Sequence, residues 1–528
     1  MDKNGWLVFL LVLALGALST GAAGDLPSRA VASIRAEEMR VQLDFLAADK
    51  LLGRNTPGAG LDTAAAFIAR TFQMCGLTPV DGSYFHEFSL HKIFLGDTNS
   101  CRITGIDGQL RDYLIKKEFM PFEMTADKNC SGEILFAGYG ITDPESGYDD
   151  YAHIDARGKI VFVLKRGPRQ NDPASPFWIH KEVSLTRVDE KIRNAIAHGA
   201  AGILLATDPL HNRLLMPRGF PWPNLYKGFP PDAVPVTVGG MEAEKTPAIQ
   251  VGEEAMVQLF GSIDALRAEQ AAIDSAMAPH SRILAGCRAD IRTSTRHSVQ
   301  HACNVVGLLE GRDPRLKEEV VIIGAHYDHV GCSKSGTAGQ DSIYNGADDN
   351  ASGTVGVLAA ARALTAAGKR PGRSILFITF AGEEKGLFGS NQYVKEPLFP
   401  LPATAAMLNM DMIGRNHPDS LTITGHLSSH ELEKALHKAN SRIGFLLDLS
   451  REGAMRGSSD HAPFARKQIP VLFFHSGLHA DYHKVSDESD KCDITKMARV
   501  AELCSRVAWL IADREEKPLF TPPAKPVK

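Results

Sequence analysis

The sequence predicts an α/β protein whose main sheet is mixed, mostly parallel and flanked by helices. From Arg288 onward, short apolar runs alternate with longer segments that have helical spacing. The runs "EVVIIG", "RSILFITF", "TAAMLNM" and "IPVLFF" lack polar alternation, which is typical of strands buried on both faces. The length of 528 residues allows a large core and more than one domain.

Composition and charge narrow the class of protein. The chain is 44% hydrophobic and 23% charged, as in ordinary soluble globular proteins. Its net charge of -4 leaves no basic excess to neutralise phosphates, so we expect no nucleic-acid partner. Eight cysteines are spread along the chain without a C-x-x-C pair. A thiolate zinc site is therefore not expected, and the disulfide pairing stays open.

Residues 1–24 have the pattern of a signal peptide. Lys3 precedes an apolar run from Trp6 to Leu18, and small residues follow up to Gly24. The alternative is a membrane anchor, but the run is shorter than the roughly 20 residues that span a bilayer. We therefore expect a secreted or periplasmic protein that keeps no stable membrane anchor after cleavage.

The remaining chain divides by texture. Helix, Gly/Pro loop and helix follow one another between Ala36 and Val80, and "DITKMARVAELCSRVAWLIADR" is a closing amphipathic helix. The segments "GKIVFVLKRG", "AIAHGAAGILLATD" and "TPAIQV" form a separate strand and helix alternation. The predicted main domain has two parts, residues 25–130 and 262–514. Residues 131–261 are the predicted α/β insert, and residues 515–528 are a disordered Pro/Lys tail.

Groups able to bind metal follow several of the predicted strands. In open α/β sheets, functional sites form where the carboxyl ends of strands meet. Five sets occur there or in the Gly-rich loop "NGADDNASG", namely His326 with Asp328, Asp348 with Asp349, Glu383 with Glu384, Asp411, and Tyr482 with His483.

Each set alone has an ordinary structural explanation. Adjacent acids are usually a solvated patch, and Asp before a helix is most often an N-cap. Together, however, so many carboxylates at one sheet edge would repel one another unless a cation lay between them. A pair of divalent metals needs a bridging carboxylate, and His with Asp or Glu suits zinc.

The two adjacent glutamates can have different roles. Neighbouring side chains point in different directions, so one of Glu383 and Glu384 can bind metal while the other accepts a proton from water. Spacing alone leaves open which glutamate does which. His326 and Asp328 lie two apart in extended chain and point the same way, which suits a ligand and the carboxylate that orients it.

The motifs "AHYDHVG", "NGADDNASG", "FAGEEKGLFGS", "NMDMIG" and "DYHKVSD" resemble the co-catalytic di-zinc exopeptidases. That family includes aminopeptidase Y, the bacterial leucyl aminopeptidases and glutamate carboxypeptidase. "SSDHAPF" and "LLGRNTPG" are similar to it as well. The resemblance covers about residues 36–80 and 288–512, and it implies the zinc exopeptidase fold.

The resemblance also implies two Zn²⁺ ions per chain and a role for each residue. Asp349 would bridge the metals, with Asp348 as the competing choice. His326 and Asp411 would complete one site, and Glu384 and His483 the other. Glu383 would be the general base, Asp328 would support His326, and Tyr482 resembles an oxyanion-stabilising tyrosine of some members.

The predicted function is an exported aminopeptidase that hydrolyses N-terminal residues from peptides with a free N-terminus, through a metal-bridged water. The insert resembles a protease-associated domain, and a passive insert is the alternative. A carboxypeptidase or dipeptidase on the same scaffold is the second hypothesis, and glutaminyl cyclases share that scaffold. A non-catalytic binding protein, as in transferrin receptors, is the third, although no ligand position is lost here. The preferred residue and the oligomeric state stay open.

Overall fold

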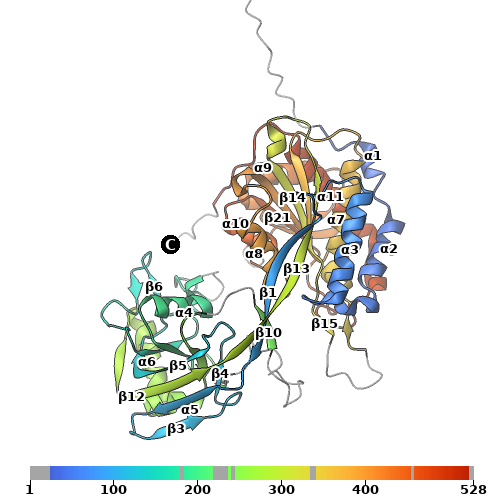
Figure 1. The fold of residues 1–528 in the computed structure, drawn as a ribbon. Helices are drawn as coiled ribbons and strands as arrows, with labels where there is room; N and C mark the ends of the chain where they lie inside the picture. Colours follow the sequence, from blue (N-terminus) through green and yellow to red (C-terminus); the bar gives the residue numbers. More distant parts are fainter. Residues whose placement is uncertain are drawn as a thin grey trace, which may run out of the picture.

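The computed structural model describes residues 24–178, 184–217, 236–239, 244–332, 341–452 and 457–522. The predicted signal peptide therefore lies almost wholly outside the described residues. Figure 1 shows a larger α/β unit joined by a long two-stranded ribbon to a second, smaller unit. Among the described residues, no helix is both long enough and apolar enough to cross a membrane.

The larger unit is built on a nine-stranded sheet. Its strands, in spatial order, are β10 (Val236–Gly239), β1 (Phe85–Leu95), β13 (Thr295–Leu309), β17 (Ser374–Phe380), β14 (Val320–His326), β18 (Thr404–Met410), β21 (Val471–His475), β19 (Ser420–Thr424) and β20 (Leu446–Asp448). The central strands β17, β14, β18 and β21 are parallel neighbours. Antiparallel pairs lie on both sides of them. The predicted mixed sheet flanked by helices is confirmed, with its main parallel part at the centre.

Helices cover both faces of this sheet. The helices of this unit are α1 (Ser28–Val31), α2 (Ala36–Leu46), α3 (Ala59–Met74), α7 (Gly353–Thr365), α8 (Phe388–Lys395), α9 (His430–Asn440), α10 (His461–Arg466) and α11 (Ile494–Ala512). Val321 and Ile323 of β14 pack in the core formed with α2, α3, α7, α9 and α11. Val320 and Ile322 pack on the other face, with α8 and α10 (Figure 1). This alternation is expected of a strand buried on both faces.

The smaller unit contains an eight-stranded sheet. Its strands, in spatial order, are β3 (Leu110–Tyr113), β2 (Ser100–Thr104), β12 (Arg282–Thr293), β5 (Lys128–Phe136), β8 (Ile160–Leu164), β9 (Gly202–Ala206), β11 (Ala248–Val251) and β4 (Phe119–Pro121). Helices α4 (Val188–Ala197), α5 (Glu253–Phe260) and α6 (Ile263–Ala276) pack against it. This sheet begins before residue 131 and ends after residue 261, so it is wider than the predicted insert.

The two units are joined by strands that run on from one sheet into the other. Leu95 at the end of β1 pairs with Thr295 at the start of β13. The chain enters the second sheet at β2 soon after Leu95, and it leaves through β12, which ends at Thr293. β10 returns from the insert to pair with β1 in the first sheet. The second unit is thus inserted between two residues that are paired neighbours.

Candidate metal centre

The predicted site residues meet at the carboxyl edge of the central strands. His326 is the last residue of β14, and Asp411 follows β18 directly. Glu383 and Glu384 come just after β17. Each strand is an apolar run that stops at the sheet edge, so the polar residues that follow it reach the same place.

A first group lies around His326. Its Nε2 atom is 3.5 Å from Asp411 Oδ1 and 4.0 Å from Glu383 Oε2. All three could offer a ligand atom to one ion. His326 and Asp411 are buried, and Glu383 is nearly so.

A second group contains His329, Asp349, Glu384 and His483. His483 Nε2 is 3.1 Å from Asp349 Oδ2 and 3.1 Å from Glu384 Oε2. His329 Nδ1 is 2.7 Å from Glu384 Oε1. His483 is 38% exposed at its side chain, so this group opens to solvent on one side.

Asp349 lies between the two groups. Its Oδ1 atom is 3.4 Å from His326 Nε2, whereas its Oδ2 atom is 3.1 Å from His483 Nε2. One carboxylate therefore offers a different oxygen to each group, which is what a bridging ligand of a metal pair requires.

Asp348, the competing candidate for the bridge, has other partners. Its Oδ1 atom accepts a hydrogen bond of 2.6 Å from the Gly414 backbone N–H, and its Oδ2 atom is 3.3 Å from His479 Nε2. The Asp487 carboxylate accepts the backbone N–H groups of both Asp348 and Asp349. These contacts hold the backbone that carries Asp349 while Asp348 faces away from the two groups.

The donor set fits zinc. Asp349 Oδ2 and Asp411 Oδ1 are buried. His483 Nε2 and His326 Nε2 lie 3.1 and 3.5 Å from them, but neither oxygen has a hydrogen-bond partner of suitable geometry among the described residues. Buried polar atoms are normally paired, so such atoms in a cluster need a further partner. Imidazole nitrogens and carboxylate oxygens are zinc ligands.

The electrostatic environment separates the two glutamates. Burial raises the pKa of Glu383 well above its ordinary value, and Asp460 and Asp411 raise it further. Burial would also raise the pKa of Glu384, but hydrogen bonds from His329 and His483 hold it well below its ordinary value. The pKa values of the two adjacent carboxyl groups are therefore shifted in opposite directions.

Asp328 supports the site from behind. Its Oδ1 atom accepts a 3.1 Å hydrogen bond from the Glu383 backbone N–H, and its Oδ2 atom accepts one of 3.0 Å from Thr56 Oγ1. His326 Nδ1 is 3.2 Å from the Asp328 backbone oxygen and 3.7 Å from Oδ1. Asp328 thus contacts both the predicted ligand His326 and the predicted base.

Tyr482 stands at the solvent side of the cluster. Its ring stacks on His483 with centroids 4.0 Å apart, and the residue is 37% exposed. Burial of the hydroxyl and the nearby carboxylates raise its pKa, so the phenol stays protonated and can donate a hydrogen bond.

Two supporting residues were not predicted. His329 lies in the quoted motif "AHYDHVG" but received no role. Arg54 is fully buried and donates to the backbone oxygens of Tyr327, Asn345 and Gly346, at 2.8, 2.8 and 2.9 Å. The one sequence signal for this role was an arginine inside the Gly/Pro loop "LLGRNTPG". It was a weak signal, because an arginine is rarely fully buried.

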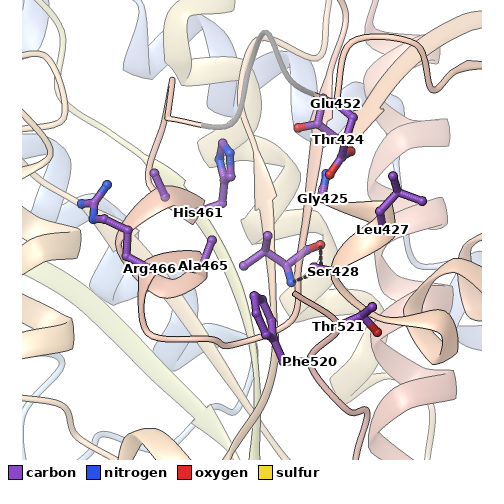
Figure 2. A pocket seen from close by; sticks show the side chains of 12 residues that line it. Thr424, Gly425, Leu427, Ser428, Glu452, His461, Ala465, Arg466, Phe520 and Thr521 are labelled. Carbon is purple, nitrogen blue, oxygen red and sulfur yellow. Dashed lines mark hydrogen bonds between the residues drawn. The ribbon is translucent and has the colours of Figure 1, made fainter. Parts of the chain in front are cut away.

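The cluster lines a cavity of about 80 Å³. A second cavity, of about 140 Å³, lies between Val471, α10 and the C-terminal segment at Phe520 and Thr521 (Figure 2). His461 lines this second cavity and stacks on Phe473, which lines the first, with ring centroids 4.5 Å apart. The second cavity contains none of the predicted site residues, so the chemistry belongs to the first.

Comparison with known proteins finds a family whose sequence model matches the segment that contains the metal centre. Residues 304–508 match the model of Peptidase family M28. Leupeptin-inactivating enzyme 1 of Streptomyces exfoliatus is 32% identical over 189 residues, which are 36% of this chain and 38% of that protein. Aminopeptidase YwaD of Bacillus subtilis is 28% identical over 236 residues, covering 42% of this chain and 47% of that protein. The resemblance predicted from the motifs is confirmed over this segment.

The fold likeness extends further than the sequence likeness. An aminopeptidase from Aneurinibacillus sp. strain AM-1 superposes over 94% of this chain and 98% of its own, with a TM-score of 0.52 and 20% identity. At that identity the likeness concerns the fold. The chain spans less than half the length of the two curated relatives above.

Proposed function

Residues 304–508 match the model of Peptidase family M28, and from this premise we propose that the protein is a di-zinc aminopeptidase. The observation that carries the proposal is the position of Asp349, whose two oxygens face His326 and His483 separately. A single zinc site would not need one carboxylate shared between two groups of ligands.

We assign the ligands from the two groups. His326, Asp411 and one oxygen of Asp349 would hold the first zinc, and Glu384, His483 and the other oxygen of Asp349 the second. When bound, the zinc ions would polarise the substrate carbonyl and make water a stronger acid.

Glu383 does the proton transfer in this proposal. Its carboxylate accepts a proton from the attacking water as the water oxygen forms a bond to the carbonyl carbon of the first peptide bond. The same proton then passes to the amide nitrogen, the carbon–nitrogen bond breaks, and Glu383 returns to its starting state. A raised carboxyl pKa favours such a residue, because it must both take and give a proton near neutral pH.

Tyr482 and Asp328 have supporting parts. The protonated Tyr482 hydroxyl donates a hydrogen bond to the carbonyl oxygen as negative charge develops on it. Asp328 keeps the Glu383 backbone and His326 in place through the contacts described above.

The substrate proposed is a peptide with a free N-terminus. The Bacillus subtilis relative is an aminopeptidase, which favours this end of the peptide. Export through residues 1–24, and a protease-associated character for the second unit, remain parts of the proposal that rest on sequence patterns.

The test compares matched substrates with and without a chelator. Zinc-loaded protein is assayed on leucyl-p-nitroanilide, on its N-acetylated form and on an N-acetylated (blocked) peptide with a free C-terminus. Cleavage of the free-amine substrate alone, lost with chelator, is the expected result. Release of C-terminal residues from the blocked peptide would favour the carboxypeptidase reading. Failure to cleave any of them, with zinc bound, would favour a binding protein.

A further inference from the structure

Part of the wall of the metal-centre cavity has, apart from Tyr482, no role in the proposed chemistry. Besides the predicted ligands and Glu383, the cavity is lined by Met412, Ser458, Phe473, His475, Leu478 and Tyr482. Met412 and Phe473 are buried apolar side chains. His475 is the one residue of this wall whose ring carries nitrogen atoms that can donate or accept a hydrogen bond, and it is only 3% exposed.

The tautomer of His475 is fixed by its backbone contact. Its Nδ1 atom lies 2.7 Å from the Asp411 backbone oxygen. A carbonyl oxygen only accepts, so Nδ1 carries the hydrogen, and in the neutral ring the lone pair is on Nε2. His475 Nε2 is buried and has no hydrogen-bond partner among the described residues. A buried acceptor without a partner is costly unless a ligand supplies a donor.

The ring of His475 is also fixed in orientation. It stacks on Phe473 with centroids 5.4 Å apart and planes 16° from parallel. Phe473 stacks in turn on His461, at 4.5 Å and again 16°. The ring therefore has a packed neighbour on one face and a hydrogen bond at Nδ1, so its Nε2 atom is held in one place.

We propose that His475 Nε2 accepts a hydrogen bond from the side chain of the substrate's first residue. The favoured class is a short side chain that has both apolar carbon and a hydroxyl or amide donor, with threonine as the best example. Its methyl group would contact Phe473 and Met412. This inference rests on the proposed aminopeptidase function and names the substrate that the same site selects.

The α-ammonium of the substrate is the competing donor, and the site offers it better partners. Glu383, Glu384, Asp349 and Asp411 all line the same cavity. A carboxylate binds an ammonium more strongly than a neutral imidazole does. The side chain is therefore the substrate group that remains for His475.

The experiment uses threonyl- and valyl-p-nitroanilide, which have nearly the same shape and differ by hydroxyl and methyl. The kcat/KM of zinc-loaded protein is measured for both, in the wild type, in His475→Phe and in His475→Gln. We expect the wild type to favour threonine by about 10-fold or more, because valine leaves the buried acceptor unpaired. His475→Phe should lose this ratio, and His475→Gln should keep part of it through its amide oxygen.

Zinc content of each variant is measured beside the rates, because His475 also touches the backbone of the predicted ligand Asp411. A threonine-to-valine ratio near one in the wild type, or an unchanged ratio in His475→Phe with zinc intact, would overturn the inference. An equal loss on both substrates would assign Nε2 to the α-ammonium instead, and would also overturn it.

Failure of the proposed function has a different signature. If no anilide is cleaved, calorimetric binding of free L-threonine and L-valine to the zinc-loaded protein decides the inference separately. Tighter binding of threonine, abolished in His475→Phe, would support the pocket without the activity. Equal binding of the two amino acids would refute it.

Discussion

His329 donates a hydrogen bond to Glu384, with Nδ1 2.7 Å from Oε1, and both side chains are buried. This contact orients one predicted ligand through a residue that has no assigned part in the reaction. It also leaves Glu384 ionised, since the hydrogen bond lowers its pKa. Loss of a partner of this kind typically costs about 10- to 100-fold in metal affinity.

Replacing His329 by Phe should weaken zinc binding while the fold persists. We expect the affinity of the zinc site that contains Glu384 to fall about 10- to 100-fold, as it does when other supporting partners of metal ligands are removed. Zinc titration with a chromophoric chelator measures it. His430→Phe is the matched control, because His430 is 64% exposed and lies on α9. Unchanged affinity in His329→Phe would mean that Glu384 does not need this partner.

The two adjacent glutamates should separate in their effects. Glu383→Gln keeps the shape of the side chain but cannot accept a proton, so turnover should fall by about 10²–10⁴ with both metals retained. Glu384→Gln should mainly weaken one metal site, because it removes a ligand charge. Metal analysis beside turnover tests both variants. Metal loss in Glu383→Gln alone would reverse the assignment, and normal behaviour of both would make the pair a surface patch.

The zinc-loaded chain should contain two zinc ions, and their removal should lower its melting temperature. The cluster places several carboxylates at close range, and metal ions remove that repulsion. Ligands that bind only the folded state stabilise it by mass action. Elemental analysis and thermal melting, with and without chelator, check both statements. A content well below one ion per chain after reconstitution would contradict the di-zinc assignment.

Arg54→Met should destabilise the loop that carries Asp349. Burial lowers the pKa of Arg54 to about 10, so it is still charged at neutral pH. It donates to backbone oxygens at Asn345 and Gly346, and the variant leaves these without partners. Breaking a buried charged network typically costs about 3–5 kcal/mol. Thermal unfolding measures the loss, with exposed Arg35→Met as control, and equal melting temperatures would refute this role.

Glu123 should make stability depend on pH. Burial raises its pKa from 4.5 to about 7, and Asp189 adds to the shift. Because the folded pKa is the higher one, the contribution to stability is complete below pH 4.5 and is lost as the pH rises through 7. Glu123→Gln should therefore be more stable than the wild type at pH 8, by up to about 3 kcal/mol, and equal to it near pH 4.5. Melting at both pH values tests this, with exposed Glu145→Gln as control, and a difference that does not change with pH would contradict it.

The site residues at the ends of strands could be predicted because these strands are visible as local apolar runs in the sequence. β14 and β17 are uninterrupted apolar runs, and the polar residues that follow them stand directly at the sheet edge. Apart from His329, the residues brought together in the two groups are predicted ones. His329 was missed because it follows β14 in an irregular segment, where no periodicity indicates the direction of a side chain.

The long strands between the two units were missed for a different reason. β12 lies between β2 and β5, and Ile291 pairs with both Cys101 and Cys130. Such pairing joins residues more than a hundred positions apart, and no local pattern announces it. β1, "FHEFSLHKIFL", mixes polar and apolar residues along its length, so it also lacks the run that marks the central strands.

The pairing of Leu95 with Thr295 makes the chain a natural subject for domain excision. The chain leaves the larger unit after Leu95 and returns to it at Thr295, which is paired with Leu95. A tight turn could therefore replace residues 96–294 at little cost in loop closure. The shortened protein would lose β10 as well, and the outer edge of β1 would then offer unpaired backbone groups to other molecules. A minimal peptidase built in this way would need a charged or proline-bearing β1 to stay monomeric. The excision site is therefore defined by Leu95 and Thr295, and its cost is an unpaired edge on β1, the strand that Leu95 ends.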